Sequence, residues 1–211
     1  MPLGWLLSLA APPLCWSCGG GARPGGPLCA GCRRRLRWLG SGLVEVAGLP
    51  TWAPVAYDGP ARALVGGLKF RRAAGLADAM AAQLAACAPP GLLDGVSLVP
   101  VPLEPGRLRR RGFNQAERLA DALARRAGVP STACLERRRG ERPQVGRSRA
   151  ERLAAARDTV TVARAAEVPS RVLLVDDVIT TGGTLAACAA TLRAAGTRQV
   201  AAVAYARTLG R

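Results

Sequence analysis

The sequence contains no histidine among its 211 residues. Without an imidazole, the chain cannot build the Ser-His or Cys-His pair of many hydrolases, nor a metal site ligated by histidine. Aromatic residues make up only 4% of the chain, so aliphatic side chains must form the core. No run of about 18 apolar residues occurs, which excludes a predicted transmembrane span.

Acidic residues are scarce, with 14 against 30 basic ones, and Lys69 is the only lysine. The resulting net charge of +16 favours polyanionic partners such as phosphate-rich ligands or nucleic acid. A coding bias toward arginine accounts for the ratio of arginine to lysine but not for the shortage of acids. Both explanations stay open.

The N-terminal sequence MPLGWLLSLAAPPL is apolar but lacks the basic start of a secretory signal, and it leads into cysteines instead of a cleavage site. We therefore expect a cytoplasmic protein. Contact of this apolar start with a membrane or a partner stays open, beside burial against its own domain.

Four of the seven cysteines form two C-x-x-C pairs separated by ten glycine- and proline-rich residues. Paired knuckles of this spacing bring four thiolates to one point, as in structural zinc sites, and four sulfur ligands leave no position for a catalytic water. Disulfides are the alternative, which a cytoplasmic setting disfavours. The predicted zinc ligands are Cys15, Cys18, Cys29 and Cys32. The other three, Cys87, Cys134 and Cys188, lie in apolar stretches and are expected to be buried.

Strand and helix patterns alternate after the cysteines, which predicts a mainly parallel sheet flanked by helices. Gly48 and Pro50 indicate a boundary between a small N-terminal four-cysteine module, residues 1–48, and an α/β domain, residues 49–211. The patterns predict strands at 51–57, 95–102, 158–162, 171–177 and 199–208, with a further candidate at 131–137. They predict helices at 61–70, 73–87, 114–128 and 183–197, and a basic, mobile loop from 137 that leads into a short helix before 158.

The stretch VLLVDDVITTGGTL, residues 172–185, carries the clearest functional signal. A buried strand is expected to end at Asp176 and Asp177, where parallel sheets hold ligands. Two adjacent carboxylates repel each other, so they make better sense as acceptors for vicinal hydroxyls or as partners of a metal ion. The small residues that follow form an anion cradle at a helix N-terminus, and an ordinary capped turn is the alternative. Together these features describe a ribose 5-phosphate site.

This stretch resembles the phosphoribosyl-pyrophosphate (PRPP) signature of type I phosphoribosyltransferases. The segments VPVPLEPGRLRRRGFNQAERLADALA, AYDGPARALVGGLKFRR and RPQVGRSRAERLAAARD, joined to the four-cysteine module, resemble the ComF (ComFC-like) competence family. The resemblance runs from about Cys15 to the C-terminus. It implies a type I phosphoribosyltransferase-like α/β fold with an N-terminal zinc knuckle, and Mg²⁺ bound together with PRPP.

The resemblance also implies roles for particular residues. Asp176 and Asp177 would be catalytic and hold the ribose hydroxyls. The residues implied to bind PRPP, chiefly its 5′-phosphate, are Val178, Thr180, Thr181, Gly182, Gly183 and Thr184. Those expected to contact pyrophosphate or nucleic acid are Leu103, Glu104, Arg107, Arg109 and Arg111, and a solvated basic face is the alternative for the arginines. The implied flexible loop contributes Gln144, Arg147 and Arg149.

Three functions stay open at this stage. The chain is a phosphoribosyltransferase-like enzyme using Mg·PRPP, a non-catalytic factor that handles single-stranded DNA during natural transformation, or a PRPP-binding regulator. The resemblance implies a place in DNA uptake at the cytoplasmic side of the inner membrane, beside other competence proteins. No sequence feature identifies an acceptor base.

Overall fold

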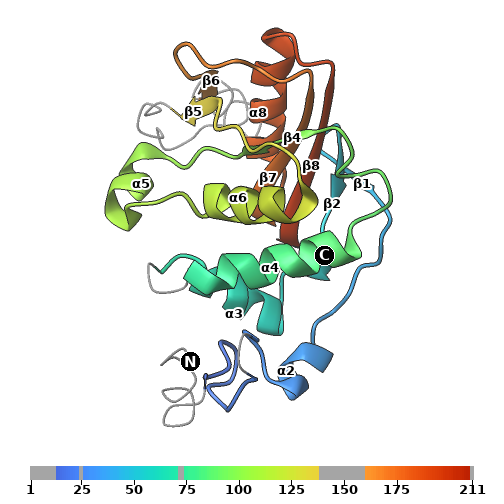
Figure 1. Cartoon of the computed structure of the whole chain (residues 1–211), viewed down its shortest axis with the longest axis vertical. Coiled ribbons are helices and arrows are strands. Elements are labelled where there is room, and N and C mark those ends of the chain that lie inside the picture. The colour runs from blue at the N-terminus through green and yellow to red at the C-terminus, as the bar shows by residue number, and fades with distance from the viewer. Residues whose placement is uncertain (1–12, 24–25, 71–73, 138–159, 210–211) are drawn as a thin grey trace, which may run out of the picture.

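A mixed sheet of six strands, counted within the described residues, organises the chain (Figure 1). The computed structural model describes residues 13–23, 26–70, 74–137 and 160–209. The strand order is β1-β2-β8-β7-β4, and β3 also pairs with β8. All pairs in this sheet are parallel except β1 with β2. The mainly parallel sheet that the sequence predicts is therefore confirmed.

The longest strands lie at the centre of the sheet. β7 (Arg171–Ile179) lies between β4 (Ser97–Pro100) and β8 (Gln199–Arg207). The opposite edge contains β1 (Val44–Val46), β2 (Leu49–Trp52) and β3 (Val55–Ala56). A separate antiparallel ribbon joins β5 (Leu135–Arg137) to β6 (Val160–Val162). The candidate strand at 131–137 therefore exists in shortened form and lies outside the main sheet.

Helices cover both faces of the sheet. On one face lie α3 (Gly59–Gly67), α4 (Ala74–Cys87) and α6 (Gln115–Ala127), and α4 packs on α6. On the other lies α8 (Gly183–Ala194) with the β5–β6 ribbon. Two short helices, α2 (Ala30–Arg34) and α5 (Pro105–Arg111), lie outside these layers. Within the described residues, none of the helices has the length and apolarity needed to span a membrane.

The two-sided cover explains the continuous apolar run of β7. Leu173 and Val175 belong to the core beneath α3, α4 and α6, whereas Val172 and Leu174 belong to the core beneath α8. Successive strand residues point to opposite faces, so a strand covered on both sides must be apolar throughout. The same rule does not account for the polar residues toward the carboxyl end of β7, Asp176 and Asp177.

The strand predicted at 51–57 is interrupted. Thr51 and Trp52 pair with β8, the pairing stops, and Val55 and Ala56 resume it in the same register. Pro54 lies in the gap and has no N–H to donate to a ladder. The predicted helix at 61–70 is also shorter, since α3 begins at Gly59 and ends at Gly67.

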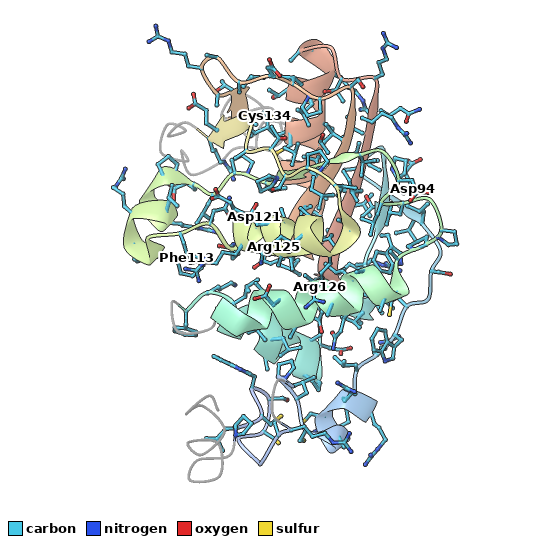
Figure 2. The ribbon with its side chains drawn as sticks, viewed as in Figure 1. Asp94, Phe113, Asp121, Arg125, Arg126 and Cys134 are labelled. Atoms are coloured by element: carbon cyan, nitrogen blue, oxygen red, sulfur yellow. The ribbon has the colours of Figure 1, made fainter. Side chains whose placement is uncertain are left out.

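Helix α6 matches its prediction closely, and its ends show why. The Asn114 side chain caps its first turn by accepting from Ala116 N at 3.1 Å, and Gly128 ends it in the left-handed conformation. Arg125 lies on α6 (Figure 2). Its guanidinium pairs with Asp78 of α4 at 2.9 Å. Both side chains are more than half exposed, so this ion pair contributes little to stability.

The cysteine module packs against α3. Cys15, Leu28 and Cys32 belong to the same buried cluster as the core of α3 and α4. Gly67 allows the closest approach, because a Cβ there would lie 2.6 Å from Cε3 of Trp16. β1 pairs with β2 and is thus part of the main sheet, although its residues fall in the N-terminal module predicted over residues 1–48. The division of the chain at 48 and 49 stays a prediction.

Candidate functional site

A cavity of about 200 Å³ opens at the carboxyl ends of β4 and β7. The two strands are parallel and in register, with Pro100 opposite Val175, and Val101 N donates to the carbonyl of Val175 at 2.9 Å. The segments that follow both strands therefore meet at one edge of the sheet, where such folds bind ligands. The cavity is lined by Lys69, Val101, Pro102, Leu103, Glu104, Arg107, Arg111, Asn114, Gln115, Arg137, Asp176, Asp177, Val178, Thr180 and Thr184.

Asp176 and Asp177 both line this cavity, but they lie inside β7, which continues to Ile179. The expected end of the strand at residue 177 is therefore wrong by two residues. Asp177 N donates to Asp176 Oδ1 at 2.8 Å, which holds the Asp176 carboxyl against the backbone of Asp177. Asp177 is only 5% exposed, and its buried Oδ2 has no hydrogen-bond partner within the described structure.

The carboxyl groups of Asp176 and Asp177 interact unfavourably when both are ionised. Burial and the neighbouring Asp177 carboxylate raise the pKa of Asp176 well above its ordinary value, while Lys69 acts in the opposite direction. A buried acceptor without a donor costs free energy that a bound hydroxyl or cation would offset. Both features favour a ligand at this position.

The small-residue loop after β7 leads into α8. Thr180 and Thr184 line the cavity, whereas Thr181, Gly182 and Gly183 are not among its lining residues. α8 begins at Gly183, and its N-cap residue, Gly182, offers no side-chain cap. The first-turn N–H groups of such a helix are available to an anion.

Gly182 is also needed for close packing. Its φ is +75°, and a Cβ at this position would lie 2.6 Å from Val46 Cγ1 and 3.0 Å from Ala47 Cβ. The turn between β1 and β2 has positive φ at both Ala47 and Gly48, as in the type I′ hairpin turn. This hairpin therefore lies directly against the loop that precedes α8.

The segment after β4 provides the opposite wall. Leu103, Glu104, Arg107 and Arg111 line the cavity, but Arg109 is exposed and is not among the lining residues. Glu104 caps α5, accepting from Gly106 N at 2.9 Å and Arg107 N at 3.1 Å. The hydrogen bond from Gly106 is the main reason that the pKa of Glu104 is lowered. Glu104 therefore has a structural role as well as a place in the cavity.

The sequence interpretation missed six lining residues, of which four are polar: Val101, Pro102, Lys69, Asn114, Gln115 and Arg137. Asn114 Nδ2 donates to the carbonyl of Val101 at 3.0 Å, and Arg111 Nη1 donates to Gln115 Oε1 at 2.9 Å, so the amides position other parts of the wall. The sequence does contain a feature that could have identified Lys69, because it is the one lysine in an arginine-rich chain. The residues expected in the flexible loop, Gln144, Arg147 and Arg149, lie outside the described residues.

The cavity therefore combines a carboxylate pair, four basic side chains and the uncapped start of a helix. Carboxylates accept from hydroxyl groups or hold hard cations, and guanidinium groups and helix N-termini bind phosphates. A ligand with both hydroxyl and phosphate groups would satisfy these two sets of protein groups together.

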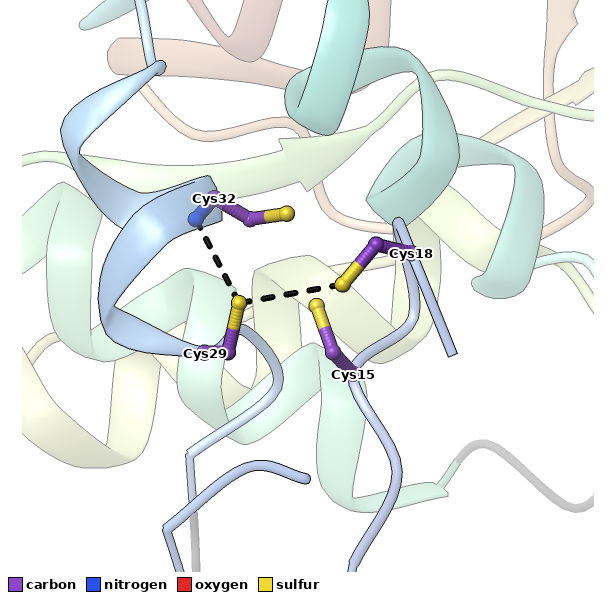
Figure 3. A group of neighbouring side chains, drawn as sticks. All are labelled: Cys15, Cys18, Cys29 and Cys32. Carbon is purple, nitrogen blue, oxygen red and sulfur yellow. Dashed lines mark hydrogen bonds between the residues drawn. The ribbon is translucent and has the colours of Figure 1, made fainter. Parts of the chain in front are cut away.

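The four N-terminal cysteines converge as expected (Figure 3). Their Sγ atoms all lie within 4.8 Å of one another, no disulfide joins them, and Cys18 Sγ is 3.8 Å from Cys29 Sγ. Cys29 caps α2 by accepting from Cys32 N at 3.4 Å. This cluster can hold a metal ion.

The thiols of the cluster differ in acidity. Burial raises the pKa of Cys15, but backbone hydrogen bonds from Cys29, Cys18 and Ser17 outweigh it and lower the pKa to about 6. A hydrogen bond from Ser17 lowers the pKa of Cys32, but burial and the neighbouring thiols raise it to about 12. Clustered thiols resist ionising together without a cation, which is consistent with a metal site. Cys134 and Cys188 are buried, as the sequence predicts, whereas Cys87 is only half-buried.

We expect Asp176→Asn to stabilise the ligand-free chain at neutral pH. The folded state binds the Asp176 proton more tightly than the unfolded state does, so stability falls as pH rises from about 3.8 through the raised pKa. Asparagine removes that loss, and a gain of ~1 kcal/mol raises Tm by roughly 2–4 °C.

Thermal melts without Mg²⁺, from pH 4 to 8, measure this effect. The gain from Asp176→Asn should shrink toward pH 4, and Asp94→Asn, at an exposed position away from the cavity, should show no such trend. A variant that is less stable than the wild type at every pH would contradict the prediction.

Comparisons with known proteins agree with this geometry. The model of the phosphoribosyl transferase domain matches residues 109–209. Competence protein ComFC from Streptococcus pneumoniae is 36% identical over 102 residues, 48% of this chain and 44% of the relative. Competence protein F from Haemophilus influenzae is 36% identical over 107 residues, 49% of this chain and 47% of the relative. The matched segments thus span less than half of each relative.

Among solved structures, orotate phosphoribosyltransferase from Aeropyrum pernix has 23% identity, with a TM-score of 0.37. The match covers 81% of this chain and 75% of that chain. The domain match, the mostly parallel sheet and the cysteine cluster agree with the expected fold. The domain match and the two competence relatives support a ComF-like type I phosphoribosyltransferase family for this chain.

Proposed function

We propose that the chain binds Mg·PRPP in the cavity at the carboxyl ends of β4 and β7. The observation that carries this proposal is the buried Asp177 Oδ2, which has no partner within the described structure although basic side chains line the same cavity. A stable protein rarely leaves such an oxygen unpaired unless a ligand, water or ion completes it. Vicinal ribose hydroxyls would donate to Asp176 and Asp177.

The rest of PRPP fits the surrounding groups. The 5′-phosphate would lie at the loop from Thr180 to Thr184, where hydroxyls, Val178 and the first N–H groups of α8 are close. The pyrophosphate would face Leu103 and Glu104, with Arg107, Arg111 and Lys69 supplying positive charge. Arg109 is a poorer candidate because it does not line the cavity.

The donor set also suits Mg²⁺. Magnesium prefers oxygen ligands, usually one or two carboxylates together with substrate phosphates, and Asp176 and Asp177 supply such oxygens beside the proposed pyrophosphate. When bound, the ion would neutralise charge on the pyrophosphate. The arginines would orient that group, and the Asp pair would stabilise positive charge developing on the ribose.

The proposed reaction is pentosyl transfer from PRPP. In it, the bond from ribose C1 to pyrophosphate breaks and a bond to an acceptor forms. The loop containing Gln144, Arg147 and Arg149 would close over the ribose and exclude water. The alternative is a non-catalytic protein that senses PRPP, since no residue so far identifies an acceptor.

Calorimetry with Mg·PRPP tests the binding proposal. We expect heat from the wild type, loss of binding in Asp177→Ala, and binding about tenfold weaker in Lys69→Gln, because one charge-assisted contact contributes ~1.5 kcal/mol. Asp94→Ala should bind like the wild type. Absence of heat from the folded wild type would refute the proposal.

Release of pyrophosphate separates transfer from sensing. The wild type is incubated with Mg·PRPP and each common nucleobase, and Asp177→Ala provides the background. Release above that background with one base supports the enzyme. Binding without release for any base supports the sensing protein.

We also propose that the four cysteines hold a structural Zn²⁺ in the module expected over residues 1–48. Tetrahedral Zn–S bonds of about 2.3 Å place sulfurs about 3.8 Å apart, and the distance between Cys18 Sγ and Cys29 Sγ is 3.8 Å. Because Cys15 and Cys32 pack in the core with α3 and α4, zinc would stabilise the adjoining helices as well as the module.

Metal analysis after gel filtration should give about one zinc per chain. Cys32→Ser should lose the metal and lower Tm, because Cys32 is both a ligand and buried, at 3% exposed. Cys87→Ser is the matched control, since Cys87 is half-buried and outside the cluster. A wild type that folds without metal and melts unchanged after chelation would contradict the zinc site.

We further propose that the chain acts in DNA uptake during natural transformation, with single-stranded DNA and other competence proteins as partners. The names of both relatives, which are competence proteins, and the net charge of +16 support this role. A cytoplasmic location, with peripheral contact at the inner membrane, fits the role and is part of the proposal.

Titration with single-stranded DNA at several salt concentrations tests this role. We expect binding that weakens steeply as salt rises, because arginines displace counterions from phosphates. No binding at low salt would rule out direct DNA handling, and it would leave PRPP binding untouched.

A further inference from the structure

A second, larger hollow lies at the opposite end of the sheet from the cavity. Its volume is about 590 Å³, and it is formed by the amino ends of β7 and β8, the connection from α4 to β4, and residues beside β1 and β2. The apolar part of its lining consists of leucine, proline, valine and alanine residues, among them Leu43, Pro50, Leu92 and Val172. Leu43 leaves 51% of its surface exposed there. We call this hollow the basic groove.

Three arginines supply the charge of the basic groove: Arg171, Arg193 and Arg198. All three are exposed, and no acidic residue is among the lining residues. In the part of the chain that the structure describes, none of the three pairs with a carboxylate. The three guanidinium groups are therefore available to pair with acidic groups of a partner.

Arg171 is held in place before any partner arrives. Its Nε donates to Gln199 Oε1 at 2.9 Å, a contact between β7 and β8. Its Nη1 would lie only 3.0 Å from a Cβ on Gly95, so this glycine, with φ of +60°, leaves room for the guanidinium. A fixed guanidinium loses less conformational entropy on binding a carboxylate than a mobile one does.

We propose that the basic groove is a docking surface for an acidic peptide segment that carries an apolar side chain. Arginine binds carboxylates through paired hydrogen bonds, and the apolar lining provides a place for a leucine-like or aromatic anchor. Nucleic acid is the weaker candidate because the lining between the arginines is aliphatic and has no aromatic side chain on which bases would stack.

The partner would leave the cavity open. Arg171 and Asp176 are five residues apart on β7, which corresponds to about 17 Å along a strand. A peptide in the basic groove and PRPP in the cavity would thus bind the same strand at its two ends. This proposal does not depend on PRPP binding, and its failure would leave the proposed function intact.

Selection of a phage-displayed random peptide library on the full chain tests the proposal. We expect enriched peptides that combine glutamate or aspartate with a large apolar residue. Their affinity, measured by fluorescence anisotropy, should fall about tenfold or more in the charge-reversed variant R171E/R193E/R198E, as three ion pairs of ~0.5 kcal/mol each would give. Leu43→Ser should weaken them separately, because it removes an exposed apolar contact.

The variant R34E/R35E/R126E is the matched control, since it changes net charge equally at three exposed positions outside the basic groove. The control should keep its affinity for the peptides. Equal losses in both triple variants, or no enrichment of acidic peptides, would overturn the proposal. Displacement of the peptide by a single-stranded oligonucleotide that the groove variant no longer binds would also overturn it, in favour of nucleic acid.

Discussion

The repulsion between two consecutive carboxylates on the central strand is the constraint on which the site depends. β7 is buried on both faces, and its apolar residues contribute to two separate cores. Asp176 and Asp177 extend the same strand into the cavity, where one oxygen is buried without a partner and the other carboxyl is hard to ionise. A purely structural role would favour neutral residues at both positions, so the pair makes sense as part of a site that a ligand completes.

Much of this arrangement was predictable because it follows from local patterns. The continuous apolar run of β7, the Asn114 cap and Gly128 end of α6, and the paired cysteine knuckles each carry their signal within a few residues. Contacts between distant segments were not predictable in this way. Lys69 lines the cavity from just after the end of α3, and the β1–β2 turn packs on Gly182. Both contacts join segments that are far apart in the sequence and form only when the whole chain folds. The interruption at Pro54 also has a local signal, because proline has no N–H to donate to a ladder.

The two ends of the sheet have different chemistry. The carboxyl ends of β4 and β7 gather carboxylates, basic side chains and an uncapped helix start, which suit a small ligand with hydroxyl and phosphate groups. The amino ends of β7 and β8 carry arginines over an apolar lining, which suits a peptide. The cysteine module contributes Cys15 and Cys32 to the core that it shares with α3 and α4, so a metal there would stabilise that core.

A bound ligand is expected to offset the repulsion between the Asp176 and Asp177 carboxylates. Carbon-13 NMR of aspartate-labelled chain, with Asp176 assigned from Asp176→Asn, measures its titration directly. We predict that Asp176 titrates above the ordinary aspartate range without ligand, and that Mg·PRPP moves its pKa downward. A carboxyl that titrates in the ordinary range and does not respond to Mg·PRPP would contradict the account.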